Sequence, residues 1–228
     1  MKISSLAEVH QVFLSFRGDQ LRYSFVSHLL DAFERHGILC FVDKDELRGQ
    51  NMTNLFVRIK ESKIALVIFS TRYAESSWCM DELVMMKKRV DKGKLQVIPI
   101  FYKVRATDVR GQTGEFGDKF WELAKTSRGY QIMQWKEALE CISNKMGLSL
   151  GDKSSEADFI KEIAEEVERV LFEILRKAAK DYQCISFLLD KKRKMYPIFP
   201  ESKKSWKWSY QFLKCKRSRL KREKTNKV

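Results

Sequence analysis

Short apolar runs alternate along the chain with longer segments in which apolar residues recur every three or four positions. The short runs occupy 11–16, 38–42, 64–69, 96–102 and 146–150. The run at 64–69 is apolar at every position, which is typical of a parallel strand buried on both faces. We therefore predict five strands.

Helical periodicity fills the segments between these runs. Leu21, Phe25, Leu29 and Phe33 recur every four residues and predict one amphipathic helix that ends before Gly37. The same periodicity predicts further helices through 55–59, over 78–90, around 120–124 and 135–146, and along 159–175.

Strands that alternate with helices form βαβ units, which build a parallel sheet covered by helices on both faces. We predict an α/β, flavodoxin-like fold with a doubly wound five-stranded parallel sheet. Ligands on such sheets bind beyond the carboxyl ends of the strands, so the loops that begin near Arg17 and Ser70 are candidate sites. Pro99 interrupts the fourth run and lacks an N–H group, which predicts that this strand lies near an edge or at a bulge.

Positive charge is concentrated in the C-terminal segment. Residues 1–180 contain 29 Lys and Arg against 26 Asp and Glu, whereas residues 181–228 contain 15 against 4. The apolar fraction of 44% suffices for a packed core and excludes a wholly disordered chain. We predict an N-terminal extension at 1–8, one domain at 9–177 and a basic, disordered tail at 178–228.

Composition also bears on the cellular compartment. No apolar run approaches the roughly 18 residues that a membrane span needs. Glu8 and His10 interrupt the first apolar stretch, so no secretory signal is expected. The five cysteines form no C-x-x-C pair, and with three histidines they predict reduced thiols and no bound metal. These features predict a cytoplasmic protein, with the nucleus as the alternative location.

Five blocks of sequence carry a family resemblance. They are VFLSFRGDQLR (12–22), FVDKDELRG (41–49), SSWCMDEL (76–83), VIPIFYKV (97–104) and DVRGQTGEFG (108–117). In this order they resemble a plant-type Toll/interleukin-1 receptor homology (TIR) domain, over residues 9–177. Such domains open many plant immune receptors. The nucleotide-binding domain and leucine-rich repeats of those receptors are not recognisable here, so the resemblance implies a TIR-only protein or a truncated receptor.

The resemblance implies an NAD⁺ glycohydrolase that signals in plant defence, with NAD⁺ as substrate and no cofactor. Ordinary glycosidases need two carboxyl groups because their leaving oxygen must be protonated. Nicotinamide leaves as a neutral ring, so one carboxylate that stabilises the cationic ribosyl transition state suffices. Glu82 in SSWCMDEL matches the family's catalytic glutamate. The sequence leaves three products open: open ADP-ribose, a cyclic isomer or an adduct with another nucleotide.

Two neighbours of Glu82 are rival candidates on the residues alone. Asp81 and Glu82 both lie near the start of the predicted helix, where any carboxylate stabilises the helix dipole. Cys79 lies at the same helix start, where a thiol can act as a nucleophile. No histidine is near Cys79 in the sequence, which favours a buried thiol.

Substrate contacts implied by the resemblance involve Arg17, Gly18, Arg22, Ser76 and Trp78. Arg17 and Gly18 follow the first strand, where glycine permits close backbone approach and arginine can bind phosphate oxygens. On the residues alone, Ser76 is equally well explained as a helix cap and Trp78 as a core residue.

Self-association is the next property that the resemblance implies, since family members act as assemblies in which a loop of one protomer completes its neighbour's site. The surface for this contact includes Ser27 and His28, with the helix at 156–177 alongside. The homo- or hetero-oligomeric partners are other TIR domains. On the residues alone, His28 is a half-exposed helix residue.

Three departures from the family pattern bear on turnover rate and the assembly surface more than on the chemistry of Glu82. Those in the loops at 43–50 and 103–105, together with the missing receptor domains, favour a different function. The first block has FRGDQLR where the family has FRGEDTR, Leu47 replaces an arginine, and Lys103 and Arg105 replace two acids. The alternative is a non-catalytic TIR adaptor that binds other TIR-domain receptors. Basic clusters at 191–194 and 214–224 offer nucleic-acid binding or nuclear import through the tail, against the simpler explanation of a solvated arm.

Overall fold

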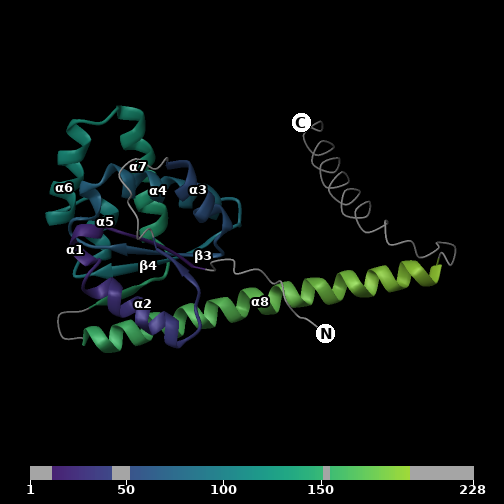
Figure 1. Ribbon diagram of the computed structural model, residues 1–228. Helices are drawn as coiled ribbons and strands as arrows, with labels where there is room; N and C mark the ends of the chain where they lie inside the picture. Colours follow the sequence, from purple (N-terminus) through teal and green to yellow (C-terminus); the bar gives the residue numbers. More distant parts are fainter. Residues whose placement is uncertain (1–11, 43–51, 151–154, 196–228) are drawn as a thin grey trace, which may run out of the picture. The chain divides into compact units, whose positions relative to one another are not determined.

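The computed structural model describes residues 12–42, 52–150 and 155–195 (Figure 1). Its described strands form one five-stranded sheet, parallel throughout, in the order β2-β1-β3-β4-β5. The strands are β1 (Val12–Phe16), β2 (Cys40–Phe41), β3 (Ile64–Phe69), β4 (Gln96–Tyr102) and β5 (Leu148–Leu150). The predicted doubly wound, flavodoxin-like sheet is therefore confirmed.

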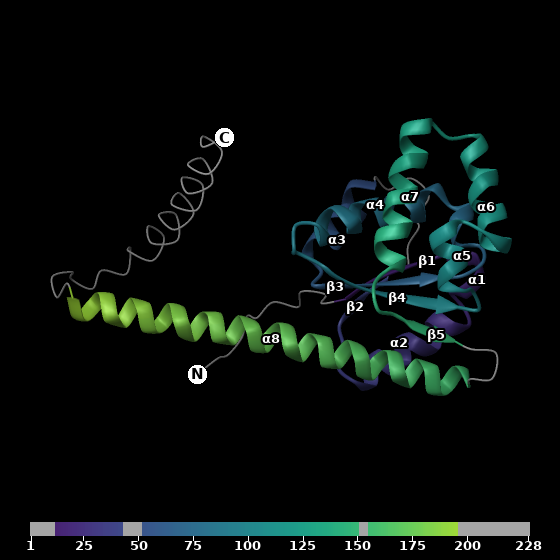
Figure 2. The same ribbon diagram turned by 180° about the vertical axis from the view of Figure 1, so that it is seen from behind.

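Helices cover both faces of this sheet. They are α1 (Gly18–Leu21), α2 (Phe25–Arg35), α3 (Met52–Glu61), α4 (Ser77–Val90), α5 (Ala106–Gly111), α6 (Gly114–Lys125), α7 (Gly129–Ser143) and α8 (Glu156–Met195), with a 3₁₀ turn η1 (Tyr73–Glu75). Figures 1 and 2 show α2 and the first part of α8 on one face of the sheet. The other face carries α3 to α7.

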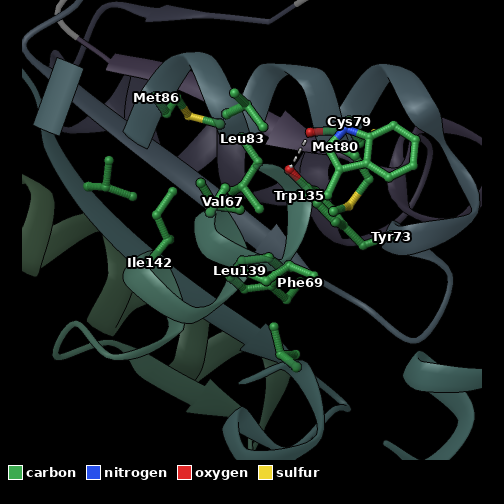
Figure 3. Packing of buried hydrophobic residues seen from close by; sticks show 14 of the residues in the cluster. Val67, Phe69, Tyr73, Cys79, Met80, Leu83, Met86, Trp135, Leu139 and Ile142 are labelled. Atoms are coloured by element: carbon green, nitrogen blue, oxygen red, sulfur yellow. Dashed lines mark hydrogen bonds between the residues drawn. The ribbon is translucent and has the colours of Figure 1, made fainter. Parts of the chain in front are cut away.

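Strand alternation divides the core into two clusters of buried apolar residues. The α8 cluster lies between the sheet and the helices α2 and α8, and the α4 cluster lies between the other face of the sheet and α3 to α7. Every residue of β3 is buried, and the even-numbered ones pack with α2 and α8 while the odd-numbered ones pack with α4 and α7. Figure 3 shows Val67 and Phe69 among side chains such as Leu83 and Leu139. In β1, Phe13 belongs to the α4 cluster, so Ser15, two residues later, points to the same face.

The predicted position of this strand near an edge fits the observed sheet, in which β4 is second from the edge, whereas the alternative of a bulge does not. β4 lies between β3 and β5 and pairs with β3 without a bulge. Pro99 is tolerated because the pairing with β5 starts one residue later, at Ile100. Gly147 precedes β5 and lies directly against Pro99, where a Cβ atom would collide with the proline carbonyl oxygen. The short edge strand β5 therefore pairs with β4 only beyond Pro99.

The predicted single helix after β1 is two helices. α1 ends at Leu21 and α2 begins at Phe25. Between them Ser24 has φ −123° and ψ −104°, outside the helical region. Leu21 and Phe25 are both buried in the α8 cluster, so the apolar stripe continues across the break and hides it in the sequence.

The C-terminal helix differs from the predicted disordered tail. α8 continues to Met195, beyond the boundary at 177. No glycine or proline occurs between Gly151 and Pro197, so nothing in this sequence breaks the helix. The chain divides into two compact units at Leu175 and Arg176, and the predictions for 1–8 and 196–228 lie outside the described residues. Across the part of the chain that is described, no helix is both apolar enough and long enough to cross a bilayer.

Candidate functional site

Glu82 is a buried acid that points toward the first strand. Its side chain is 5% exposed and lies on the face of α4 that packs on the sheet. The Ser15 hydroxyl donates a hydrogen bond of 2.7 Å to Glu82 Oε2. Ser15 is the fourth residue of β1, so the carboxylate lies close to the carboxyl end of that strand. This is the end at which doubly wound sheets bind ligands.

Tyr73 continues the contact. Its hydroxyl lies 2.8 Å from Ser15 Oγ and donates a 3.1 Å hydrogen bond to the Cys79 carbonyl, drawn as the dashed line in Figure 3. Burial raises the pKa of the Tyr73 hydroxyl well above its usual value, and Cys79 and Glu82 raise it further, against a lowering by the Ser15 hydrogen bond. The phenol therefore keeps its proton and can donate it.

Neither Ser15 nor Tyr73 stands out as a site residue in the sequence. The available signal was Ser15 itself, a hydroxyl on the α4 face of a strand that is otherwise apolar. A buried hydroxyl requires a hydrogen-bond partner. The partner could not be identified, because Ser15 and Glu82 are 67 residues apart.

Asp81 points away from Glu82 and binds a neighbouring helix. Its Oδ1 accepts a 2.8 Å hydrogen bond from the indole Nε1 of Trp135 and a longer one of 3.4 Å from Gln131. Adjacent residues of an α-helix point about 100° apart, so one acid meets the sheet while the other meets α7. The geometry gives Asp81 a structural explanation.

The start of α4 is fixed by capping and burial. Ser76 is the N-cap residue, and its hydroxyl accepts a 3.2 Å hydrogen bond from the Cys79 N–H. Trp78 is half-buried and packs against the α4 cluster. Cys79 is a buried thiol whose Sγ donates to the Phe16 carbonyl at 3.6 Å. The substrate contacts of Ser76 and Trp78 remain predictions.

Arg17, Gly18 and Arg22 gather at the carboxyl end of β1. Arg17 forms an ion pair of 2.9 Å with Asp19, and its Nε has no hydrogen-bond partner among the described residues. The Arg22 side chain folds back over Gly18, where a Cβ atom would lie 2.9 Å from the Arg22 Nη2. The Arg22 guanidinium also lies 5.6 Å from the ring centre of Phe16. Glycine leaves this space to the arginine, whose side chain would have to shift if a Cβ atom were present.

Ser27 and His28 lie on a different face from Glu82. Both belong to α2, which packs on the face of the sheet opposite α4. His28 is exposed, and the Ser27 hydroxyl donates to the Ser24 carbonyl at 2.7 Å. Ser27 also lines a groove of about 400 Å³ that reaches Arg22. The structure therefore separates the predicted self-association residues from the predicted catalytic acid.

A larger cavity of about 820 Å³ lies beyond β4. It is lined by the segment that contains Lys103 and Arg105, by the start of α6 and by Leu150 at the end of β5. Within the described residues, neither this cavity nor the α2 groove is lined by Glu82. No cluster of three or more metal-ligating side chains occurs in that same part of the chain. The loop at 43–50, in which Leu47 replaces a family arginine, lies outside the described residues.

A family model and several plant proteins match this chain in sequence. The family model described as TIR domain matches residues 9–207. Disease resistance protein RBA1 of Arabidopsis thaliana is 65% identical over 176 residues, which cover 77% of this chain and 48% of that protein. Disease resistance protein RPS4B of the same plant is 46% identical over 168 residues, covering 74% of this chain and 14% of that protein. The chain thus spans half or less of the length of these curated relatives.

A solved structure supports the same comparison. The TIR domains of the activated Roq1 resistosome, a complex that directly recognises the pathogen effector XopQ, superpose with a TM-score of 0.63 at 37% sequence identity. The match covers 68% of this chain and 98% of that chain.

Proposed function

Since this chain belongs to the TIR domain family, we propose that it signals in plant innate immunity by cleaving NAD⁺ between nicotinamide and ribose. Glu82 is the catalytic residue of this proposal, NAD⁺ is the substrate, and the reaction uses no further cofactor. One observation carries the assignment. Glu82 is a buried acid held 2.7 Å from Ser15 at the ligand-binding edge of the sheet, while Asp81 is bonded to Trp135.

The chemistry requires little beyond a carboxylate in a water-poor site. When the bond from ribose C1′ to nicotinamide breaks, its electron pair stays with the nitrogen and the ring leaves neutral. Positive charge then develops on the ribosyl group, and a nearby carboxylate stabilises it. Water adds its oxygen to C1′ and releases one proton, which gives ADP-ribose; attack by the adenine ring instead gives the cyclic product.

Substrate binding in this proposal uses the groups around the end of β1 and the start of α4. Arg17 offers its Nε as a donor for a phosphate oxygen, with Gly18 and Arg22 beside it. Ser76 and Trp78 border the nicotinamide side. The β1 group and the α4 group lie next to each other in part because the Cys79 thiol donates to the Phe16 carbonyl at 3.6 Å, which holds the start of α4 against the end of β1.

Self-association through the face with α2 and α8 is the second part of the proposal. His28 is exposed on α2, and α8 leaves Phe172 and Leu175 at 67% and 60% exposure. Large apolar side chains at such exposure are candidates for burial in an interface. We propose that other TIR domains bind at this face, in the cytoplasm, while nucleic acid could bind only through the basic tail.

A non-catalytic adaptor is the second candidate function. The observation that favours it is the burial of Glu82, because a side chain that is only 5% exposed leaves little room for a nucleotide beside it. Lys103 and Arg105, which replace two family acids, line a surface cavity, and the Arg105 side chain is 85% exposed. The replacement therefore makes the charge of this cavity more positive. An adaptor would bind other TIR domains and release no nicotinamide.

The deciding experiment measures nicotinamide release from NAD⁺ by the full chain at high protein concentration. Glu82→Gln is the test variant, because the amide oxygen can still accept the Ser15 hydrogen bond while the negative charge is lost. Asp81→Asn is the matched control, because it removes the neighbouring charge and keeps the acceptor for Trp135.

We expect the wild-type chain and Asp81→Asn to release nicotinamide and Glu82→Gln to release none. Equal activity in Glu82→Gln would contradict the assignment of Glu82. A wild-type chain that is folded, self-associated and silent would exclude the glycohydrolase and leave the adaptor.

A further inference from the structure

We propose that Ser15 and Tyr73 are positioning residues that fix the orientation of the Glu82 carboxylate. The inference rests on the proposed NAD⁺ cleavage, and it concerns residues that the family blocks did not assign. Three oxygens form a chain inside the protein, in which Tyr73 OH lies 2.8 Å from Ser15 Oγ, which lies 2.7 Å from Glu82 Oε2. A carboxylate held in this way presents its second oxygen in a defined direction.

Both hydroxyl groups are held by rigid surroundings. Ser15 is 1% exposed, and β1 pairs with β2 on one side and with β3 on the other. Tyr73 is fully buried, and its ring packs edge-on against Phe69 with 5.0 Å between ring centres. Groups on packed strands and rings hold a site more tightly than groups on loops do. Ser15 can therefore act as a fixed reference point for the acid.

The hydroxyl protons show which contacts the pair can satisfy. Ser15 gives its single proton to Glu82, so Tyr73 supplies the only hydroxyl proton for either Ser15 Oγ or the Cys79 carbonyl. The Cys79 carbonyl belongs to the first turn of α4, the helix that carries Glu82. The Tyr73 hydroxyl therefore contacts both the strand hydroxyl and the backbone of the helix that carries Glu82, and donates its proton to one of them at a time.

Packing alone does not require these hydroxyls. Phenylalanine and alanine would fill nearly the same volume in a cluster that is otherwise mostly apolar. Removing one hydroxyl lowers stability because its buried partner loses a hydrogen bond, so the folding of each variant is measured beside its turnover. A displacement of about 1 Å at a reacting group can lower a rate about 100-fold. A positioning role therefore predicts a large effect on turnover with the fold retained.

The test compares Tyr73→Phe and Ser15→Ala with matched controls in the full chain. Tyr102→Phe removes a tyrosine hydroxyl that donates to Glu156 on the opposite face of the sheet, at 2.9 Å. Ser62→Ala removes a buried serine hydroxyl that donates to the Arg58 carbonyl, at 2.9 Å. Steady-state kinetics with NAD⁺ and a crystal structure of each variant provide the measurements.

We expect kcat to fall about 10-fold in Tyr73→Phe and about 100-fold in Ser15→Ala, with KM for NAD⁺ nearly unchanged and both controls within about twofold of wild type. The crystal structures should show Glu82 rotated away from its wild-type position. An unchanged kcat in both test variants, or a rise in KM alone, would overturn the inference.

Failure of the proposed function has a separate signature. If the wild-type chain itself releases no nicotinamide, NAD⁺ cleavage is excluded, and the positioning role is decided by the crystal structures. A displaced Glu82 in Ser15→Ala and Tyr73→Phe then supports positioning of the carboxylate. An undisturbed Glu82 in both overturns it.

Discussion

The indole Nε1 of Trp135 donates a 2.8 Å hydrogen bond to Oδ1 of Asp81, across the packing of α7 on α4. Trp135 is fully buried, so this acceptor satisfies a donor that water does not reach. The next residue, Glu82, points to β1 and Ser15 instead. Two adjacent acids thus face different parts of the protein. Substitution of Asp81 should affect stability, and substitution of Glu82 should affect the chemistry.

Replacing Asp81 by alanine should lower stability and leave the chemistry intact. The buried Trp135 N–H would lose its acceptor, which costs about 1–3 kcal/mol in the free energy of unfolding. Urea denaturation measures this cost, and Asp81→Asn, which keeps an oxygen acceptor, should recover most of it. A loss of nicotinamide release in folded Asp81→Ala would contradict the structural role.

Ser76→Ala should remove the cap of α4. The Cys79 N–H would lose its acceptor at 3.2 Å, and we expect a loss of about 1 kcal/mol in the free energy of unfolding. Ser76→Asp should restore the cap, and the exposed Ser77 gives a control position for alanine. If Ser76→Asp regains stability without regaining activity, Ser76 also contacts substrate; full recovery of both supports capping alone.

Gly147→Ala should be destabilising because a Cβ atom would collide with the backbone of Pro99. Overpacking of this kind costs about 1–3 kcal/mol. Gly129 begins α7 and has no atom within 4 Å of the position of a Cβ, so Gly129→Ala should be neutral or slightly stabilising. Thermal and urea unfolding of the two variants distinguish these outcomes, and equal stability would rule out the close approach.

Stability should depend on pH through Glu75. The hydrogen bond from Arg72, at 3.0 Å, lowers the pKa of Glu75, and Lys119 at 3.2 Å lowers it further, against the rise from burial. Because the folded pKa lies below the ordinary value of about 4.3, this contribution is complete above that pH and is lost as the pH falls through the folded pKa.

Glu75→Gln therefore should be less stable than the wild type at pH 7, and the difference should shrink as the pH falls below about 4.3, as measured by urea unfolding. Glu61→Gln is the control, since Glu61 is half-exposed and contacts Arg58 on the same helix, an arrangement that contributes little. A Glu75→Gln difference that does not change with pH would contradict the role of the charge.

His28→Ala should weaken self-association and lower activity without affecting the fold. The side chain is exposed, so the free energy of unfolding should change by less than about 0.5 kcal/mol. If His28 lies in the interface, nicotinamide release at a fixed concentration should fall about fivefold or more. Sedimentation velocity measures the assembly, and Lys92→Ala, at an exposed position in the turn after α4, is the control. Unchanged sedimentation and activity would remove His28 from the interface.

The amino-acid sequence alone determined much of the fold, because its signals are local. The buried runs at 64–69 and 96–102 predicted two strands with the bounds that the structure has. The alternation of these runs with helical periodicity predicted the parallel doubly wound sheet. The family blocks selected Glu82, since helix position by itself treated Asp81 and Glu82 alike.

The tertiary structure decided what depends on residues far apart in the chain. Pro99 predicted a strand near an edge or at a bulge, and only the tertiary structure shows that β4 is second from the edge, with β5 pairing beyond the proline. Ser15 meets Glu82 across 67 residues, and Asp81 meets Trp135 across 54. Periodicity specifies which face of an element is buried, but not which element covers it. The partners of Glu82 and Asp81 therefore follow from the packing of α4 between β1 and α7.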